Sequence, residues 1–497
     1  MTSRRLRGIA HLALSLLLAA PMALGEALDE RAWLDVRSAN FHIRSVLGEE
    51  RTLELLRHLE ITHRALGDGT GGSLREAPTP TIILAVDSHD DYVAIGAPSF
   101  TAGYFFSDLR ENAILIEDGP GSSGIQVILH EYAHYLSRLT GRVRYPRWFE
   151  EGNAEYLSHS RLHAQALEFA LPAERHMTTL DHADWLPWTQ VLETSDTAAL
   201  GLDEGALFYA QSWLLVHYLR SRPDADQTLS QTLAHYSRLV SDDGVAIDAF
   251  EDAFSVKVKD LDRDIQHYYR TREFTSRLLP VDTSLAGFAP RVREMTRPDV
   301  QLALARMAMR FENIDGAERW FRTLLDDPEY RAHAEAGLGR IAGHRGDLAT
   351  ANERFESAIY LMAWDFNIWM DYAQYWAQRV STSKDGKERL RYSSRLIESL
   401  ESALTIAEAT PELNSLMGFA YLAKGNDPFE AIEFLEAAAD AAPYDQASRL
   451  LLANAYLYVG RPGDALNVAE AVLRFEHEPG LVSEAARDVI ERARRDR

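Results

Sequence analysis

The stretch HEYAH, residues 130–134, decides how the first half of this chain is interpreted. On a helix, residues four positions apart lie on one face, so the imidazoles of His130 and His134 can bind one metal ion. Glu131 lies beside them, where its carboxylate can take a proton from a metal-bound water that attacks a carbonyl carbon. The flanking residues are apolar nearly all round, which predicts a buried helix over 125–139 whose polar groups need partners.

A second stretch, PRWFEEGNAEY at 146–156, contains three acids that could complete a metal site. Glu150 and Glu151 point about 100° apart on a helix, so only one of them can bind a given ion, whereas Glu155 lies one turn from Glu151 on the same face. The chain has no cysteine, so any metal must be held by His and carboxylate. Two His and one Glu leave the fourth tetrahedral position to water, as zinc catalysis requires.

Together these two motifs resemble the gluzincin superfamily, specifically its compact peptidase MA-like members. Their signature is HExxH, a loop, and a helix that carries W-x-x-E-G-x-A-x-Y. The resemblance implies an α+β zincin-like metallopeptidase domain with one Zn2+ per chain, bound by His130, His134 and Glu151, and with Glu131 as the general base. Thermolysin-like relatives place an acid that hydrogen-bonds a zinc-bound His where this chain has Glu155, which implies that Glu155 orients His130.

The stretch FYAQSWLLVHYL, residues 208–219, carries a weaker resemblance. In metallo-aminopeptidase relatives a downstream helix carries Y-x-x-G, and its Tyr hydrogen-bonds the oxyanion formed on the substrate carbonyl. Tyr209 matches that Tyr, with Ser212 where the family often has Gly. His217 is expected to be a packing residue. The G-x-M-E-N motif that binds the substrate amino terminus in those relatives is not found in this sequence, so aminopeptidase specificity is not implied.

The strands expected before the HEYAH helix suggest where a substrate binds. Many zinc peptidases bind an extended substrate along the edge strand above the active-site helix. Residues Ala113–Ile116 stand in that order in the chain, and Gly103 and Tyr104 are expected to face the cleft. Strand addition would supply backbone hydrogen bonds with little side-chain selectivity.

The first 25 residues have the layout of a secretory signal peptide. Arg4, Arg5 and Arg7 precede an apolar run that ends in the small-x-small site Ala23-Leu24-Gly25. We therefore expect export and cleavage, with a periplasmic or secreted mature protein and no transmembrane span after signal cleavage. No later segment is apolar enough to cross a membrane.

The rest of the chain divides into four predicted parts. Residues 26–97 predict an N-terminal α/β subdomain and 98–273 the catalytic domain. Residues 274–297 lack clean periodicity and predict a linker or a strap against the catalytic unit. Residues 298–497 are predicted to be all helix. This boundary predicts that a chain without residues 298–497 folds and binds zinc.

The last 200 residues repeat. Small and aromatic residues recur with the period of about 34 residues that the tetratricopeptide repeat (TPR) pattern shows. The best-matched two units are marked by Gly418, Tyr421, Ala431, Leu435, Ala438 and Pro443, and by Ala453, Tyr456, Ala465, Ala469 and Val472. The resemblance implies an all-α TPR solenoid that recruits a protein partner or presents the substrate on its concave face.

Composition narrows the functional classes. The 497-residue chain carries a net charge of −23, which would repel a nucleic-acid backbone, so no nucleic-acid partner is expected. The motifs favour an exported zinc metallopeptidase acting on a peptide or protein substrate. The alternative is a TPR interaction or scaffold protein of the cell envelope, with an inactive or merely metal-binding peptidase-like domain.

Overall fold

The computed structural model describes most of the chain. Its described residues are 28–69, 81–119, 124–138, 145–195, 197, 200–222, 225–241, 246–281, 289–425, 427–475 and 480–496. The predicted signal peptide lies outside them. Within the described ranges, no helix combines the length and the apolar character that a membrane crossing requires.

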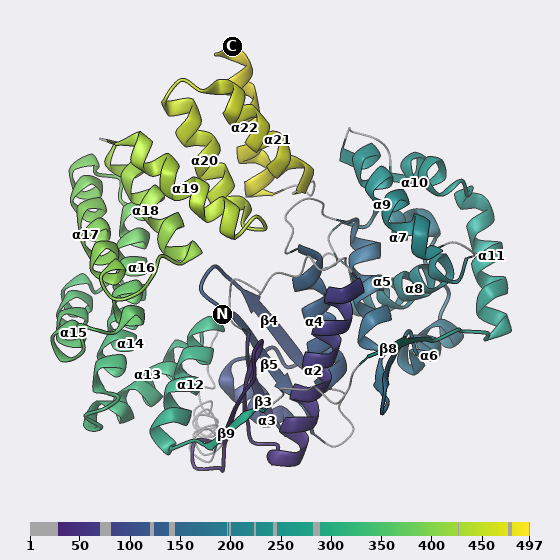
Figure 1. Cartoon of the computed structure of the whole chain (residues 1–497), viewed down its shortest axis with the longest axis horizontal. Coiled ribbons are helices and arrows are strands. Elements are labelled where there is room, and N and C mark those ends of the chain that lie inside the picture. Colours follow the sequence, from purple (N-terminus) through teal and green to yellow (C-terminus); the bar gives the residue numbers. More distant parts are fainter. Residues whose placement is uncertain are drawn as a thin grey trace, which may run out of the picture.

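A six-stranded mixed sheet forms the centre of the first half, in the order β4-β5-β3-β2-β1-β9 (Figure 1). β2, β3 and β5 are parallel, whereas β4, β1 and β9 pair antiparallel with their neighbours. The strands are β1 (Leu34–Arg37), β2 (Phe41–Ser45), β3 (Thr81–Val86), β4 (Gly103–Ser107), β5 (Asn112–Glu117) and β9 (Arg291–Glu294). β2 and β3 come before the predicted boundary between residues 97 and 98, and β5 comes after it. Because β3 pairs with both β2 and β5, this boundary does not divide two folding units.

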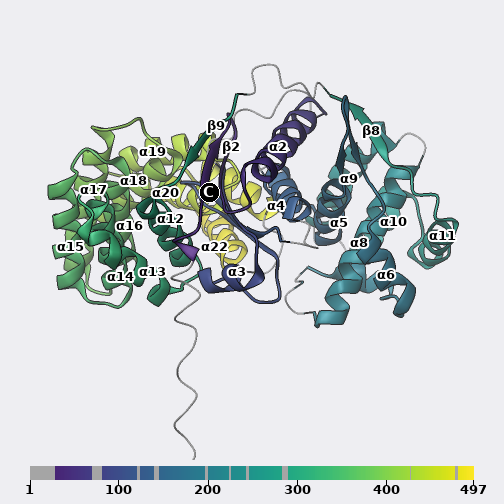
Figure 2. The same cartoon turned by 90° about the horizontal axis from the view of Figure 1, so that it is seen from below.

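The sheet is buried on both faces. Alternate side chains of a strand point to opposite faces. Ile83 and Ala85 of β3 pack with the first-half helices α2 (Glu49–Gly69) and α4 (Gly124–Arg138). Leu84 and Val86 pack on the other face, in one core with α3 (His89–Ile95) and with α12 (Arg297–Arg310), the first helix of the repeat half. Figure 2 shows α12 on one side of the sheet and α2 and α4 on the other.

A mainly helical unit follows α4. Its centre is α8, which is buried along most of its length after the first turn, and Trp148 of α5 is buried among the aromatic rings of Tyr236, Phe250 and Phe254. The elements are α5 (Arg147–Ser158), β6 (Arg161–Leu162), β7 (Ala166–Phe169), α6 (Glu174–His182), α7 (Trp188–Glu193), α8 (Leu202–Ser221), α9 (Ala225–Ser241), α10 (Ala246–Phe254), α11 (Val258–Thr271) and β8 (Arg277–Pro280).

The predicted linker, 274–297, contains two paired strands instead of an unpaired connection. β8 pairs with β7 and closes a small three-stranded sheet, whereas β9 pairs with β1 at the edge of the main sheet. All four residues of β9, RVRE, are exposed. A strand without a buried face has no hydrophobic alternation that sequence analysis could detect.

The repeat half is a series of helix pairs with TPR-like packing. A Cβ atom at Gly418 would lie 2.4 Å from Cγ of Leu435, and one at Gly339 would lie 3.0 Å from Cδ2 of Phe355, so the paired helices touch at small residues. After α12 the helices are α13 (Ile314–Thr323), α14 (Arg331–His344), α15 (Leu348–Leu361), α16 (Phe366–Thr382), α17 (Gly386–Leu404), α18 (Pro411–Lys424), α19 (Pro428–Ala441), α20 (Gln446–Tyr458), α21 (Pro462–Phe475) and α22 (Leu481–Arg495).

The repeat half curves around the first half and contacts it at several places (Figure 1). α12 packs on the sheet, as described above. The turn between β4 and β5 contacts α16 and α18. Farther along, α21 contacts α9, and the ring of Tyr444 lies 6.4 Å from that of Tyr135 on α4. The two halves therefore do not behave as independent units joined by a linker.

Candidate metal centre

Three side-chain atoms from α4 and α5 converge on one point. His130 Nε2 lies 3.1 Å from His134 Nε2, and each of these nitrogens lies 3.2 Å from Glu151 Oε2. Bonds of about 2.0–2.1 Å to a tetrahedral zinc ion place its ligand atoms roughly 3.3 Å apart. In the part of the chain that the structure describes, these residues form a group with the right donors and spacing for a metal.

Local structure explains why these three residues meet. His130 and His134 lie one turn apart on α4, and Glu151 comes from α5, which packs beside α4. α5 also packs closely against α8, because a Cβ atom at Gly152 would lie only 2.2 Å from the carbonyl oxygen of Ser212. The glycine after Glu151 therefore lets α5 sit deep enough to bury the Glu151 carboxylate, which is 1% exposed.

Protein hydrogen atoms alone do not satisfy this cluster. If both imidazoles donate to Glu151 Oε2, their two N–H groups face each other across 3.1 Å. If only one imidazole donates, the lone pair of the other points at a carboxylate oxygen. A single cation between the three atoms removes the conflict, so the donor set fits a zinc ion with two imidazole ligands and one carboxylate ligand.

The electrostatics of the site favour positive charge. Burial by itself would lower the pKa of His130, but the carboxylates of Glu155 and Glu151 outweigh burial and raise the pKa well above its usual value. Burial would raise the pKa of Glu151, yet the neighbouring imidazoles of His134 and His130 hold it below its usual range. A metal ion would therefore compete with protons for this site.

Glu155 lies behind His130, outside the three-atom cluster. Its Oε1 is 3.1 Å from His130 Nδ1, and its Oε2 is 3.0 Å from Nε2 of His176 on α6. A carboxylate on Nδ1 sets the tautomer and the direction of the ring, so that Nε2 points into the cluster. The other rival acid, Glu150, also lies outside the cluster, with its Oε2 3.7 Å from Nη1 of Arg147.

Arg147 is a site residue that the sequence analysis missed. Its Nη2 lies 2.9 Å from Glu151 Oε1, which leaves Oε2 as the oxygen that faces the two imidazoles. The same nitrogen donates to Oγ1 of Thr197 at 3.4 Å. Arg147 precedes Glu151 by four positions on one helix, and this spacing was an available signal for an ion pair. His176 had no such signal, because it comes from a different helix.

The two residues with predicted catalytic roles lie next to the cluster. Glu131 follows His130 on α4 and is half-buried. The Tyr209 ring on α8 lies 6.4 Å from the His130 ring. Burial, together with the negative charge of Glu151, raises the pKa of Tyr209 to about 12. The Tyr209 hydroxyl therefore stays protonated at neutral pH and can donate a hydrogen bond.

The structure corrects the predicted location of the edge strand and of Tyr104. β5, which includes Ala113–Ile116, is not an edge strand, since it pairs with β3 on one side and β4 on the other. The edge is β4, which runs directly over α4: a Cβ at Gly103 would lie 2.0 Å from Cγ1 of Val127. Tyr104 points to the opposite face, where its ring lies 5.2 Å from that of Phe311.

His217 has the packing role expected for it. Its Nε2 donates to the carbonyl oxygen of Ala170 at 3.2 Å, so its Nδ1 accepts from the Tyr268 hydroxyl at 2.8 Å. Burial lowers the pKa of His217. Both ring nitrogens of this neutral histidine have hydrogen-bond partners within the helical unit, so His217 acts as a packing residue.

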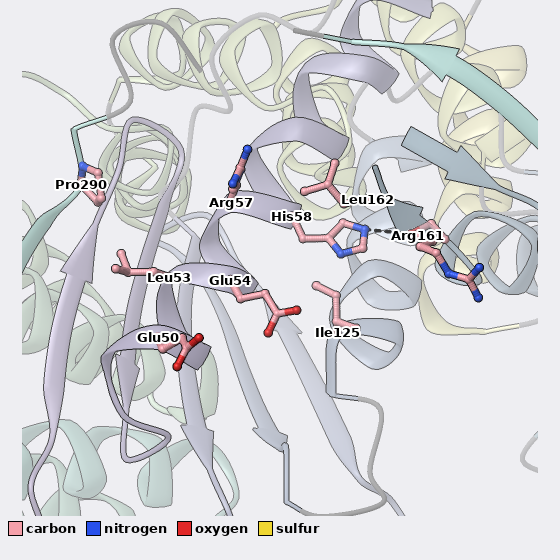
Figure 3. A pocket seen from close by; sticks show the side chains of 10 residues that line it. Glu50, Leu53, Glu54, Arg57, His58, Ile125, Arg161, Leu162 and Pro290 are labelled. Atoms are coloured by element: carbon pink, nitrogen blue, oxygen red, sulfur yellow. Dashed lines mark hydrogen bonds between the residues drawn. The ribbon is translucent and has the colours of Figure 1, made fainter. Parts of the chain in front are cut away.

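A separate hollow of about 750 Å³ lies between α2, the start of α4 and β6 (Figure 3). Its charged lining is mixed, with Glu50 and Glu54 opposed by Arg57 and Arg161. His58 also faces it, with Nε2 3.0 Å from Oγ of Ser160. The metal-binding triad does not line this hollow, and its balanced charges select no ligand type.

Comparisons with known proteins give partial matches to solved structures. No protein-family model and no curated protein matches this chain. The TPR protein TTC0263 of Thermus thermophilus has 18% identity and a TM-score of 0.31 over 40% of this chain and 98% of its own. The MamA protein has 16% identity and a TM-score of 0.29 over 37% and 97%. The STAND protein PH0952 of Pyrococcus horikoshii, with a tetratricopeptide repeat sensor, has 12% identity and a TM-score of 0.31 over 92% and 79%.

Proposed function

We propose that this chain is an exported zinc-dependent metallopeptidase that hydrolyses peptide bonds in a peptide or protein substrate. The observation that carries the proposal is the convergence of His130 Nε2, His134 Nε2 and Glu151 Oε2 within 3.2 Å of one another. A general base and a hydrogen-bond donor, Glu131 and Tyr209, flank that cluster. This combination has the parts that metal-assisted hydrolysis needs.

Each residue has a defined task in this proposal. His130, His134 and Glu151 would hold the zinc ion, which when bound polarises the scissile carbonyl and lowers the pKa of water. Glu131 takes the proton of the attacking water and passes it to the leaving amine. Tyr209 donates a hydrogen bond to the oxyanion that develops on the substrate.

Glu155 and Arg147 act through the ligands. Glu155 orients the His130 ring through Nδ1, and Arg147 occupies the Glu151 oxygen that does not face the cluster. Such supporting contacts hold ligands in a geometry that suits the metal before it binds.

A second candidate function rests on the repeat half. Its stacked helix pairs form a TPR-like scaffold, an architecture suited to protein interaction. In this candidate the chain is an interaction or scaffold protein of the cell envelope whose peptidase-like domain is inactive or merely binds metal. Retention of Glu131 beside the triad favours the enzyme over this candidate.

The deciding experiment measures the zinc content of the protein lacking residues 1–25, and its cleavage of a proteome-derived peptide library, for the wild type and Glu131→Gln. We expect one zinc per chain in both, with kcat lower by about 10²–10⁴-fold in the variant because the general base is lost. Glu54→Gln, an exposed change on α2, serves as the matched control and should cleave normally. Zinc without cleavage by either protein would support the scaffold candidate, and lack of zinc would refute the metallopeptidase.

A further inference from the structure

The turn between β4 and β5, residues 108–111, occupies the inner side of the curved repeat half (Figure 1). We call residues 103–117, with the two strands and this turn, the β4–β5 hairpin. Its tip contacts α12, α16 and α18, which belong to the first, third and fourth helix pairs of the repeat half. A repeat protein commonly binds its ligand on this concave surface. Here the surface is already in contact with the first half of the same chain.

Arg110 makes the deepest of these contacts. Its Nη1 lies 2.6 Å from Asp371 Oδ1 on α16, and its Nε lies 2.8 Å from Glu412 Oε2 on α18. Nη2 completes a two-pronged contact by donating to Glu412 Oε1 at 3.3 Å. The side chains of the two acids are only 12% and 9% exposed, so the guanidinium is held in a largely desolvated pocket. We call this pocket of Asp371, Gln374 and Glu412 the arginine pocket.

The arginine pocket is built for a guanidinium. Gln374 Nε2 donates to Glu412 Oε1, and Arg340 Nη1 lies 3.7 Å from Asp371 Oδ1. These contacts orient both carboxylates, yet leave oxygen atoms for the planar fork of an arginine, which a lysine ammonium does not match. Burial opposes ionisation of Asp371, but the charges of Arg110, Arg340 and Arg306 hold its pKa below the usual value.

The tip of the hairpin has a preset shape. Asp108 Oδ1 accepts hydrogen bonds from the backbone N–H groups of Arg110 and Glu111, at 2.8 and 2.9 Å. Ser107 Oγ donates to Asn112 Oδ1 across the base of the turn at 2.8 Å. Arg110 is therefore presented on a turn whose conformation is held by the side chains of the turn itself. This order lowers the entropy lost when the turn docks on the repeat half.

A second set of contacts flanks the arginine pocket. Arg310 at the end of α12 lies 2.8 Å from Asp108 and 2.7 Å from Glu111. The ring of Phe311 lies 4.8 Å from that of Phe106. The repeat half thus recognises the turn by a buried arginine, two flanking acids and an aromatic side chain, which together are a specific pattern.

We propose that the inner surface of the repeat half is a recognition site for an arginine at the tip of an acid-flanked β-turn, filled in this chain by its own Arg110. A protein partner that presents such a turn would bind by displacing the hairpin. Because β4 is the edge of the main sheet next to α4, displacement would also release the edge strand above the metal centre. Recognition of the turn does not depend on the presence of zinc.

The tether explains why an external turn would compete poorly with Arg110. A segment joined to its binding site acts at an effective concentration in the millimolar range. An external turn therefore binds well only when its affinity or concentration outweighs the effective concentration of the internal turn, or when Arg110 is removed. Removal of Arg110 is the sharper test, because it empties the arginine pocket and leaves the acids in place.

The experiment uses a labelled cyclic peptide with the turn sequence FSDLRENA, residues 106–113, and fluorescence anisotropy on the full chain. We expect Arg110→Ala to bind the peptide at least tenfold more tightly than the wild type. A peptide with alanine at the arginine position should not bind, and the double variant Arg110→Ala/Glu412→Gln should lose binding. Equal binding by wild type and Arg110→Ala, or binding of the alanine peptide, would overturn the proposal.

A second measurement guards against misfolding of Arg110→Ala. Hydrogen exchange of residues 103–112 should be at least tenfold faster in Glu412→Gln than in the wild type, with unchanged zinc content. Arg395→Ala, which removes a surface ion pair to Glu398 away from the hairpin, is the matched control and should leave this exchange unchanged. Unaltered exchange in Glu412→Gln would show that the arginine pocket does not hold the hairpin.

Discussion

Glu151 in the first half and the Asp371–Glu412 pair in the repeat half are all buried carboxylates on helices, but their partners differ. Asp371 and Glu412 meet a cation from the chain itself, Arg110, at 2.6 and 2.8 Å. Glu151 gives one oxygen to Arg147 and turns the other toward two imidazole nitrogens at 3.2 Å. In the repeat half a guanidinium of the chain pairs with both carboxylates, whereas at the candidate metal centre a guanidinium pairs with only one Glu151 oxygen and the other oxygen faces two imidazoles in a geometry that fits a cation.

This difference separates a charge cluster that the chain completes with its own guanidinium from one whose donor atoms fit a metal ion. Buried charges need partners, and a fork-shaped guanidinium completes the arginine pocket with protein atoms. The candidate metal centre instead gathers two imidazole nitrogens and one carboxylate oxygen, the donor types that bind zinc, within 3.2 Å of one another. Burial alone does not distinguish the two clusters, because all three carboxylates are buried; the groups that face them do.

Deleting residues 298–497 should have the largest effect on the molecule. It removes α12 from the sheet face that holds Leu84, Val86 and Leu115, and it leaves Arg110 without its acids. We expect the fragment to aggregate or to melt without cooperativity, because a large apolar face becomes exposed. Solubility and circular dichroism measure this. A deletion of α22 alone, from residue 480, is the control and should keep the first half folded. A soluble, zinc-loaded fragment would instead restore the boundary predicted from sequence.

Glu151→Gln tests the metal side of the comparison. A neutral amide is a poor zinc ligand, so we expect the zinc dissociation constant to rise by more than about 100-fold. Glu150→Gln is the matched control on the same helix, and its zinc affinity should change little. Competition with a chromophoric chelator measures both. A larger loss in Glu150→Gln than in Glu151→Gln would exchange the roles of the two acids.

Glu155→Gln is expected to have an intermediate effect. It weakens the hold on His130 Nδ1 while the three ligand atoms stay in place, so zinc affinity should fall by about 10–100-fold. The same chelator competition applies, with cobalt substitution to report on the ligand geometry. An unchanged affinity and an unchanged cobalt spectrum would show that Glu155 does not position His130.

Asp371→Asn should give the smallest effect, and it tests how much the arginine pocket stabilises the chain. The pKa of Asp371 is lowered in the folded chain, so its stabilisation is present above the pKa of an unfolded aspartate, about 3.9, and is lost as the pH falls through the folded value. We expect the variant to be less stable by about 1 kcal/mol at pH 7, and the gap to narrow below about pH 4. Urea unfolding at both pH values measures this, and a constant gap would contradict it.

Local patterns predicted much of the two halves. The HEYAH helix, the second helix with its acids, and the paired helices after residue 298 were all expected, and the described structure has helices at each place. The predicted linker was the main failure of the fold prediction, because β9 pairs along its backbone with no buried side-chain face. The edge strand was misplaced for a related reason: which strand is outermost depends on pairing, which the order of strands in the chain does not reveal.

The sequence alone determined the chemistry available to this protein: two His one turn apart, a neighbouring acid, a second helix with three acids, no cysteine, and a repeating helical half. These are short-range properties, set by helical spacing and composition. The tertiary structure decided which acid meets the imidazoles, because Gly152 lets α5 pack against α8 and bury Glu151. It also decided that Arg110 meets Asp371 and Glu412, which lie 261 and 302 positions away. Contacts over such separations depend on how sheet and solenoid pack, and no local pattern encodes that packing.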